Sequence, residues 1–542
     1  MRLSTTLFFS VSLFLGTTHA ATAEQWRKRT IYQLVTDRFA LANGTSTNST
    51  CDTSTRAYCG GSWRGVIDQL DYIQQLGFDA VWISPAAENI EVNEATKASA
   101  GEAYLGYWTG NSTSNNARFG STSDLTALSD AIHARNMYLM LDITVNNLAT
   151  ANPPNSSAAT APHTTASSDG AQEFHPLCSI NDYDNQTQVE QCWVPADGVQ
   201  TSGGANGTNA TVTAGVWFPD VNTDEALVVS EVLAASKAAV KQSGADGVRI
   251  GSVKHIGQDF WPGFRNAVGV FTLGEVMNDT VEYLEPYTAP GALDAIFDYP
   301  TYHALRAAFA TPSGNLSALI DIVTQAQKAY EGGLFLTASF LENHDTPRFA
   351  NSTSELALVM NAMVWPFIHD GIPVLYYGQE QGFSGGAPPA NHEPMWTSHY
   401  NPNRLFAQNV RGLNAARKGA MATNHFFLTT PMEFITQSTS GALAVSKPPL
   451  LALLTNAGSS SKGGSWAAKR LYKANETLVD VLTCRRFWAD AAGGVDVKIV
   501  GGMPQVSLYG TCSGWGLRSK RPAIGLDISS TVATDSIICL LA

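Results

Sequence analysis

The stretch Gly247-Val248-Arg249-Ile250-Gly251-Ser252-Val253-Lys254-His255 has the pattern of a short buried strand that passes into polar residues. Similar apolar runs occur at residues 31–35, 80–83, 138–145, 271–276, 334–341 and 374–377, with a weaker one at 295–297. Segments with helical spacing, such as 66–75 and 125–135, separate these runs. Buried parallel strands are continuously apolar and alternate with helices, so this order predicts βα units. Eight such units predict a closed (β/α)8 TIM barrel.

Two regions interrupt the alternation. Residues 147–218 are rich in Ser, Thr, Ala, Asn and Gly and are interpreted as a loop domain inserted after the third strand. Shorter β-type runs at 450–454, 478–482 and 497–500 predict a C-terminal β-sandwich. The predicted organisation is a signal peptide at 1–20, the barrel at 21–146 and 219–422, the inserted domain at 147–218, the sandwich at 423–512 and a tail of unknown structure at 513–542.

The first twenty residues have the features of an export signal. Arg2 precedes an apolar run at 7–15, and the small-residue pattern Thr18-His19-Ala20 follows. The run is much shorter than the roughly 20 residues that a bilayer span needs. About ten Asn-x-Ser/Thr sites agree with a glycosylating route, among them Asn43, Asn48, Asn155, Asn206, Asn278 and Asn475. We therefore expect a secreted, extracellular glycoprotein without a transmembrane segment.

The cysteines indicate an oxidising compartment. Six of the seven form pairs that are close in sequence: Cys51 with Cys59, Cys178 with Cys192, and Cys484 with Cys512. Local pairing predicts three disulfides. Cys539 is left without a local pair. It lies in a tail whose apolar end at 537–542 is too short for a lipid-anchor signal.

Composition limits the class of partner. The net charge is -13 and only 15% of residues are charged, which gives nucleic acid or an anionic membrane little to bind. A neutral substrate fits this composition better, and we expect a monomer. A chain of 542 residues also exceeds what one core usually organises, which favours a large domain with a smaller one.

Polar residues follow several predicted strands, and function in a barrel gathers at these strand ends. The third strand ends Leu141-Asp142-Ile143-Thr144-Val145-Asn146-Asn147, the fifth gives Gly274-Glu275-Val276, and the seventh gives Glu342-Asn343-His344-Asp345. Other short motifs are Thr30-Ile31-Tyr32, Asp37-Arg38-Phe39, Cys59-Gly60-Gly61-Ser62-Trp63, Gly106-Tyr107-Trp108 and Gly378-Gln379-Glu380.

Together these segments closely resemble the secreted fungal α-amylases of glycoside hydrolase family 13, from about residue 24 to about residue 510. The resemblance implies cleavage or transfer of α-1,4-glucosidic bonds with retention, and an α-glucan or maltooligosaccharide as ligand. Asn147, in place of a family His, is also similar to a cell-wall-associated branch with some glucan-transferring members.

The resemblance assigns roles to individual residues. Glu275 matches the acid/base and Asp345 the carboxylate that stabilises the transition state. Arg249 matches the cation beside the nucleophile, and His344 a hydrogen-bond donor to sugar hydroxyls. The remaining predicted substrate-binding residues are Tyr107, Trp108, Lys254 and His255.

The nucleophile position holds Gly251. A family nucleophile stands two residues after Arg249, where strand periodicity returns the side chain to the same face. Glycine has no atom that could form a glycosyl-enzyme intermediate, and Ser252 is expected on the opposite face. The usual retaining route, which needs two carboxyls roughly 5 Å apart, is therefore not available.

Further departures from the family lie around the predicted cleft. Leu105 and Asn147 replace family histidines, His392 replaces an Arg, and Pro388 replaces an Asp. We expect these changes to remove sugar-binding donors and acceptors, so that recognition differs from that of a starch-digesting amylase.

The resemblance also implies a Ca²⁺ site. Calcium prefers hard oxygen ligands, and the family supplies an Asn, a Glu, an Asp and a His carbonyl. These match Asn146, Glu190, Asp220 and His255.

Three functions remain open at this level. The first is a hydrolase or 4-α-glucanotransferase with an adapted route, in which Asp345 would be the base that activates a water. The second is a catalytically inactive α-glucan-binding pseudoenzyme that assists cell-wall glucan metabolism. The third is a variant sequence of an otherwise ordinary enzyme.

Overall fold

The computed structural model describes residues 21–42, 50–151, 173–193, 215–437, 441–460, 465–469 and 471–509. The predicted signal peptide and the tail at 513–542 lie outside these ranges. So do Cys512, Cys539 and the glycosylation sites at Asn43, Asn48, Asn155 and Asn206.

Eight parallel strands close into a barrel in the order β1-β10-β9-β8-β7-β6-β5-β2, which confirms the predicted fold. The strands are β1 Ile31–Gln33, β2 Ala80–Ile83, β5 Tyr138–Ile143, β6 Gly247–Ile250, β7 Phe271–Gly274, β8 Ala295–Phe297, β9 Thr337–Ser339 and β10 Ile372–Tyr376. Neighbouring strands pair in register, for example Arg249 with Asp142 on β5 and with Leu273 on β7. This pairing brings distant polar residues to one mouth of the barrel.

The predicted strand at 334–341 was too long. Its first part is a 3-10 helix, η4 Gly333–Leu336, and only Thr337–Ser339 is strand. Gly332 and Gly333 adopt positive φ angles of 73° and 69°, which turn the chain just before the barrel. Leu334 is buried from this helical turn, so its apolar character is satisfied without a strand. An apolar run alone does not distinguish the two cases.

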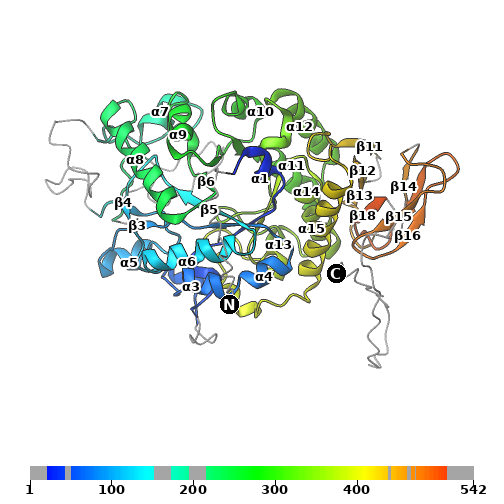
Figure 1. Cartoon of the computed structure of the whole chain (residues 1–542), viewed down its shortest axis with the longest axis horizontal. Helices are drawn as coiled ribbons and strands as arrows, with labels where there is room; N and C mark the ends of the chain where they lie inside the picture. Colours follow the sequence, from blue (N-terminus) through cyan, green and yellow to red (C-terminus); the bar gives the residue numbers. More distant parts are fainter. Residues whose placement is uncertain are drawn as a thin grey trace, which may run out of the picture.

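Helices surround the barrel (Figure 1). The longer ones are α6 Thr122–His133, α8 Ala226–Ser243, α9 Phe260–Val268, α11 Tyr299–Phe309, α12 Leu316–Ala329, α14 Leu356–Ile368 and α15 Leu405–Thr423. The shorter ones are α1 Ala23–Arg27, α2 Thr36–Phe39, α3 Trp63–Asp68, α4 Leu70–Gln75, α5 Glu94–Ala100, α7 Gln186–Gln191, α10 Val281–Leu284 and α13 Phe349–Ser352. The predicted helix at 66–75 is thus two helices, because Gln69 leaves helical geometry at φ -111° and ψ 7°.

One apolar cluster fills the barrel and a larger one lies between strands and helices. Trp26 of α1 is fully buried in the first cluster and stacks on Phe271 at 5.1 Å. Burial of a large apolar side chain stabilises a fold by roughly 1.5–3 kcal/mol. The first helix is therefore an integral part of the barrel.

The chain leaves the barrel after β5 and returns before α8. Isolated β-bridges join Asn147 to Asp220 and Thr150 to Trp217 at the base of this excursion. Its described part includes α7 and the disulfide between Cys178 and Cys192. Residues 152–172 and 194–214 lie outside the description, so the limits of the inserted domain stay a prediction.

The C-terminal region is an antiparallel β domain, as predicted. A six-stranded sheet runs in the order β11-β12-β13-β18-β15-β16, and β14 pairs with β17. The strands are β11 Glu433–Gln437, β12 Ala442–Lys447, β13 Leu450–Thr455, β14 Ser465–Ala468, β15 Thr477–Asp480, β16 Arg486–Trp488, β17 Val495–Lys498 and β18 Gln505–Tyr509. Leu451 and Leu453 pack on Trp466 of the small sheet, whereas Leu450 and Leu454 belong to the core shared with the barrel. The domain consequently lies beside α14 and α15 (Figure 1).

Two of the three predicted disulfides are confirmed. Cys51 joins Cys59 and Cys178 joins Cys192, with Cα–Cα distances of 5.5 and 4.8 Å. The third pair includes Cys512, outside the described residues. Within the described ranges, no helix has the length and apolar character required to cross a membrane.

Candidate active site

Arg249 lies at the centre of a charged group at the carboxyl ends of the strands. Its Nη1 donates to both carboxylate oxygens of Asp142 at 3.0 Å, and its Nη2 donates to Oε2 of Glu275 at 2.5 Å. Arg249 is 1% exposed. Burial opposes its charge, but Asp142 and Glu275 together raise the pKa of Arg249 well above its ordinary value. One guanidinium thus connects β5, β6 and the end of β7.

Asp142 is a buried acceptor for several donors. Besides Arg249, it receives hydrogen bonds from Trp82 Nε1 at 3.0 Å and from the Tyr107 hydroxyl at 2.6 Å. Burial raises the pKa of Asp142 to about 6, although Arg249 opposes the shift. Asp142 belongs to the motif at the end of the third strand, but no role was predicted for it. A lone acid inside the apolar run at 138–145 was the signal that could have marked it.

Glu275 has both carboxylate oxygens engaged. Oε2 accepts from Arg249, and Oε1 accepts from the Tyr299 hydroxyl at 2.5 Å. That hydroxyl in turn accepts from Asn343 Nδ2 at 2.9 Å. Tyr299 begins α11 just after β8, and no role was predicted for it. Its place at a strand end was the only available signal.

His344 and Asp345 form the opposite part of the group. Gln33 Nε2 donates to Nδ1 of His344 at 2.9 Å, which leaves the proton on Nε2, 3.2 Å from Oδ2 of Asp345. Burial and the charge of Arg249 lower the pKa of His344 to about 3, so the ring is neutral. Burial raises the pKa of Asp345 to about 6, although Arg249 opposes the shift. Tyr107 stacks on His344 with ring centroids 5.2 Å apart.

Gly251 lies directly beside this group. A Cβ atom built on it would be 2.9 Å from Nη1 of Arg249 and 3.5 Å from Cζ. A side chain at position 251 would therefore be directed at the guanidinium. In this structure Arg249 is neutralised by Asp142 and Glu275 instead.

The other predicted substrate-binding residues lie in different surroundings. Lys254 is 6% exposed and donates to the Met277 carbonyl at 2.9 Å, and burial lowers its pKa to about 8. His255 is 1% exposed and its Nδ1 donates to the Val189 carbonyl at 3.0 Å. Trp108 packs against the apolar cluster of Val92, Ala149, Val216 and Phe218.

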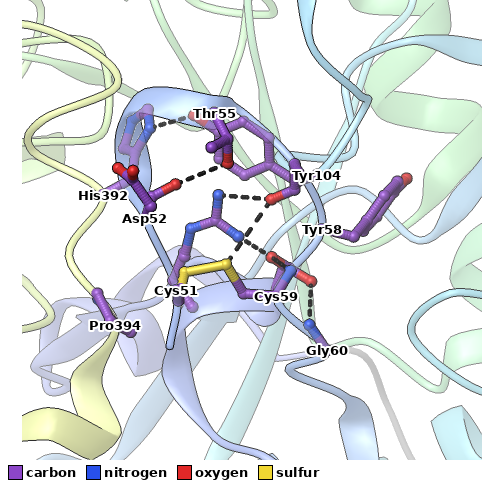
Figure 2. Close-up of a disulfide and its surroundings, with 12 residues drawn as sticks. Cys51, Asp52, Thr55, Tyr58, Cys59, Gly60, Tyr104, His392 and Pro394 are labelled. Carbon is purple, nitrogen blue, oxygen red and sulfur yellow. Dashed lines mark hydrogen bonds and ion pairs between the residues drawn. A yellow bond between two sulfur atoms is a disulfide. The ribbon is translucent and has the colours of Figure 1, made fainter. Parts of the chain in front are cut away.

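His392, which replaces a family Arg and was expected to remove a sugar-binding group, holds the backbone near His344. It is fully buried, and its ring bonds to the Tyr104 hydroxyl and the His344 carbonyl, each at 2.7 Å. Figure 2 shows His392 and Tyr104 near the Cys51–Cys59 disulfide. These two buried hydrogen bonds make His392 a support for the His344 segment. Leu105 likewise packs against the core.

Asn147 and Pro388 each lie where the backbone has a particular feature. Asn147 is 8% exposed and forms the bridge to Asp220. Pro388 precedes Pro389 through a cis peptide bond. Neither position shows a contact to Glu275 or Asp345 within the described structure.

The predicted calcium ligands form two neighbouring sets. In the first, the Asn146 carbonyl accepts from Val221 N, and Asp220 Oδ2 lies 2.7 Å from His175 Nδ1. Oδ1 of Asp220 is buried and has no hydrogen-bond partner among the described residues. Burial raises the pKa of Asp220 to about 7, against the effect of His175.

The second set brings α7 against the 3-10 helix η2 Val253–His255. Glu190 Oε1 accepts from Gln186 Nε2 at 2.7 Å, and the same nitrogen donates to the Lys254 carbonyl at 2.9 Å. In the first set, the lack of a hydrogen-bond partner for the buried Oδ1 of Asp220 raises the free energy of the folded state. The unpaired Asp220 Oδ1 suits a hard divalent cation, although the described residues contain no group of three or more His, Cys, Asp or Glu side chains placed to hold one.

The carboxylates of Asp142, Glu275 and Asp345 gather at the carboxyl-terminal mouth of a (β/α)8 barrel, the place where enzymes of this fold have their active sites. Residues 33–418 match the family described as alpha amylase, catalytic domain, and residues 434–517 match alpha-amylase, domain C. The chain belongs to the α-amylase family.

Several relatives support this membership. An α-amylase of Saccharomycopsis fibuligera is 36% identical over 92% of this chain and 94% of its own length. Alpha-amylase 1 of Lipomyces kononenkoae is 40% identical over 79% of this chain, a match that spans 64% of the Lipomyces protein. The solved structure of an α-amylase from Malbranchea cinnamomea superimposes with a TM-score of 0.81 at 35% identity, covering 90% of this chain and 98% of that one.

Proposed function

We propose that this protein binds α-1,4-linked glucan or maltooligosaccharides at the barrel mouth and lacks efficient retaining turnover. The observation that carries the proposal is Gly251 beside Arg249. A retaining glycosidase needs a nucleophilic carboxylate about 5 Å from its acid. Here the position facing the guanidinium has no side chain, and Arg249 is paired with Asp142 and Glu275.

Neither neighbouring acid is free to replace the missing group. Asp142 is 1% exposed and holds Arg249, Tyr107 and Trp82. Glu275 accepts from Arg249 and Tyr299, so one of these bonds must open before Glu275 can present a proton to a glycosidic oxygen. The group is therefore arranged to hold charge in place rather than to attack an anomeric carbon.

The features needed for sugar binding remain. Tyr107 and His344 form a stacked pair, and flat aromatic groups pack well on the apolar faces of sugar rings. Asp345, with a side chain 28% exposed, supplies a carboxylate at the mouth. A neutral glucan also suits a chain of net charge -13.

A second candidate is slow inverting hydrolysis, and the exposure of Asp345 favours it. Its side chain is 28% exposed, compared with 9% for Glu275, so Asp345 can meet a water. In an inverting site one carboxylate activates water while the other protonates the leaving oxygen. Asp345 would take the water proton and Glu275 would give the other.

Ca²⁺ is proposed as a structural ion. Asn146, Glu190, Asp220 and the His255 carbonyl would hold it, and the ion would supply positive charge to the unpaired Asp220 oxygen. The residues come from the end of β5, from α7, from the return of the excursion and from η2. Bound cation would therefore link the excursion to the barrel.

Secretion is part of the same proposal. The Cys51–Cys59 and Cys178–Cys192 disulfides suit an oxidising compartment, and residues 1–20 have the pattern of an export signal. An extracellular protein that holds α-glucan without degrading it would serve at the cell wall. The Asn147 replacement, which is similar to the cell-wall-associated branch of the family, supports this role.

The test pairs calorimetry with a rate measurement. Calorimetry with maltoheptaose should show saturable binding, and initial rates on a chromogenic maltooligosaccharide should be several orders of magnitude below those of a nucleophile-bearing relative. Amylase-level turnover, with Gly251 verified by mass spectrometry, would overturn the proposal. Binding without turnover supports the pseudoenzyme, whereas slow release of the inverted anomer supports the second candidate.

A further inference from the structure

The sequence Asn278-Asp279-Thr280 is an N-glycosylation site at the edge of the barrel mouth. It lies in the loop between β7 and α10, three residues after Glu275. Three residues span at most about 11 Å, so Asn278 is close to the acid group whatever the path of the loop. Lys254 binds the carbonyl of the preceding residue, Met277, at 2.9 Å and anchors the loop at this mouth.

The side chain of Asn278 is arranged to accept modification. Its Oδ1 accepts from the backbone N of Thr280 at 2.9 Å and from the Thr280 hydroxyl at 2.8 Å. Asn278 is partly buried, while Asp279 and Thr280 are exposed. No hydrogen bond from its Nδ2 to another described residue is present, so a glycan attached to this nitrogen would break no such bond.

Two other described sites of this kind, Asn111 and Asn351, use the same atom in hydrogen bonds to other parts of the chain. Asn111 Nδ2 donates to Glu88 Oε2 at 3.2 Å and to Ser114 Oγ at 3.1 Å. Asn351 Nδ2 donates to the Ser384 carbonyl at 3.2 Å. A glycan on either residue would remove a donor hydrogen from these contacts, whereas a glycan on Asn278 would break none of them.

We infer that Asn278 carries an N-linked glycan that narrows the leaving-group end of the glucan cleft. The inference rests on the proposed glucan binding. The acid of a glycosidase protonates the leaving-group oxygen, so the loop that follows Glu275 borders that side. A glycan fixed to this loop occupies space where a long glucan would extend, and leaves short ligands unaffected.

The modification is a balanced group transfer. Nδ2 of Asn278 forms a bond to C1 of the first sugar of a lipid-diphosphate-linked oligosaccharide and gives up one proton. The C1–O bond breaks, and the lipid diphosphate leaves with the electron pair. The donor belongs to the export route that also permits the two observed disulfides.

The test uses the full chain expressed in a glycosylating host. Variants Asn278→Gln and Thr280→Ala remove the site, while Thr280→Ser keeps it. Asn475→Gln, in the exposed turn before β15, is the matched control for loss of a glycan elsewhere. Glycopeptide mass spectrometry measures occupancy, and calorimetry measures affinity for maltotriose and maltoheptaose.

We expect a glycan on Asn278 in the wild type, in Thr280→Ser and in Asn475→Gln. Affinity for maltoheptaose should rise severalfold in Asn278→Gln and Thr280→Ala, with little change for maltotriose. An unmodified Asn278 peptide, or equal maltoheptaose affinity with and without the glycan, would overturn the inference. If no variant binds glucan although Asn278 is modified, the proposed function and the steric role both fail, but the modification stands.

Discussion

A Cβ atom on Gly251 would lie 2.9 Å from Nη1 of Arg249, and this nitrogen already binds both oxygens of Asp142. The backbone of Gly251 has no positive φ, so a side chain can be built there without strain in the main chain. The contact is with the end of a flexible side chain, which can shift. A carboxylate at position 251 would therefore have a charged neighbour, and it would fit once the Arg249 guanidinium shifts.

Gly251→Asp is predicted to raise hydrolysis of a chromogenic maltooligosaccharide by orders of magnitude. The new carboxylate would pair with Arg249 and supply the missing covalent partner. Gly251→Asn is the matched control, because it has the same shape without a nucleophile. Activity in both variants, or in neither, would contradict the prediction. Inactivity of both would place the cause of low turnover in other departures from the family, such as Leu105, Asn147 and His392.

Asp298→Asn is predicted to raise the melting temperature above pH 6. Burial raises the pKa of Asp298 to about 6 from 3.8, so ionisation costs the folded state stability. The contribution of protonated Asp298 to the stability of the folded state is complete below pH 3.8 and is lost as the pH rises toward 6. The shift of about two units corresponds to on the order of 3 kcal/mol. Asn keeps the oxygen that caps α11 through Thr301 N.

The measurement is the melting temperature of both proteins between pH 4 and pH 8. The two curves should meet near pH 4 and separate up to pH 6, then run parallel. Asp298→Ala is the control that loses both the carboxylate and the cap, so its melting temperature should lie below that of Asp298→Asn at every pH. A constant difference between Asp298→Asn and the wild type would show that ionisation is not the cause.

Chelation is predicted to lower the melting temperature if Ca²⁺ occupies the proposed site. A ligand at a free concentration of 100 Kd stabilises the folded state by about 2.7 kcal/mol. Asp220→Asn should abolish most of the chelator effect, whereas Asp224→Asn, whose side chain is 74% exposed, should retain it. Metal analysis after dialysis checks the bound ion directly. Identical melting curves with and without chelator would exclude a stabilising site.

Cys484 and Cys512 are predicted to form the third disulfide. Both lie in the C-terminal region, and they are consecutive cysteines in the sequence, as are the members of the two pairs already seen. Peptide mapping without reduction should recover a linked peptide that separates on reduction. Recovery of Cys512 as a free thiol from the secreted protein would refute this pair.

The barrel could be predicted from the sequence because its signals are local. Each strand is a short apolar run, and Glu275 and Asp345 stand within a few residues of such runs. The same local view made the strand at 334–341 too long, since an apolar residue such as Leu334 is buried equally well from a helical turn. A local apolar pattern indicates that a residue is buried, whereas its neighbours in the tertiary structure decide whether the backbone there is helix or strand.

Gly251 was also visible in the sequence, because strand periodicity fixes its spacing from Arg249. The hydrogen bonds from Arg249 to Asp142 and Glu275, and the one from Tyr299 to Glu275, were not visible in the sequence. Asp142, Glu275 and Tyr299 come from three different βα units, and the closure of the barrel brings them together. Their contacts depend on register between strands rather than on spacing within one.

The sequence by itself therefore determined the family, which predicted strand each candidate residue follows, and the absence of a side chain at position 251. Only the tertiary structure decided that His392 supports the His344 segment and that Tyr299 holds Glu275. The physical reason is that hydrogen bonds and charges act over a few ångströms of space, while the residues that share them lie tens to hundreds of positions apart in the chain.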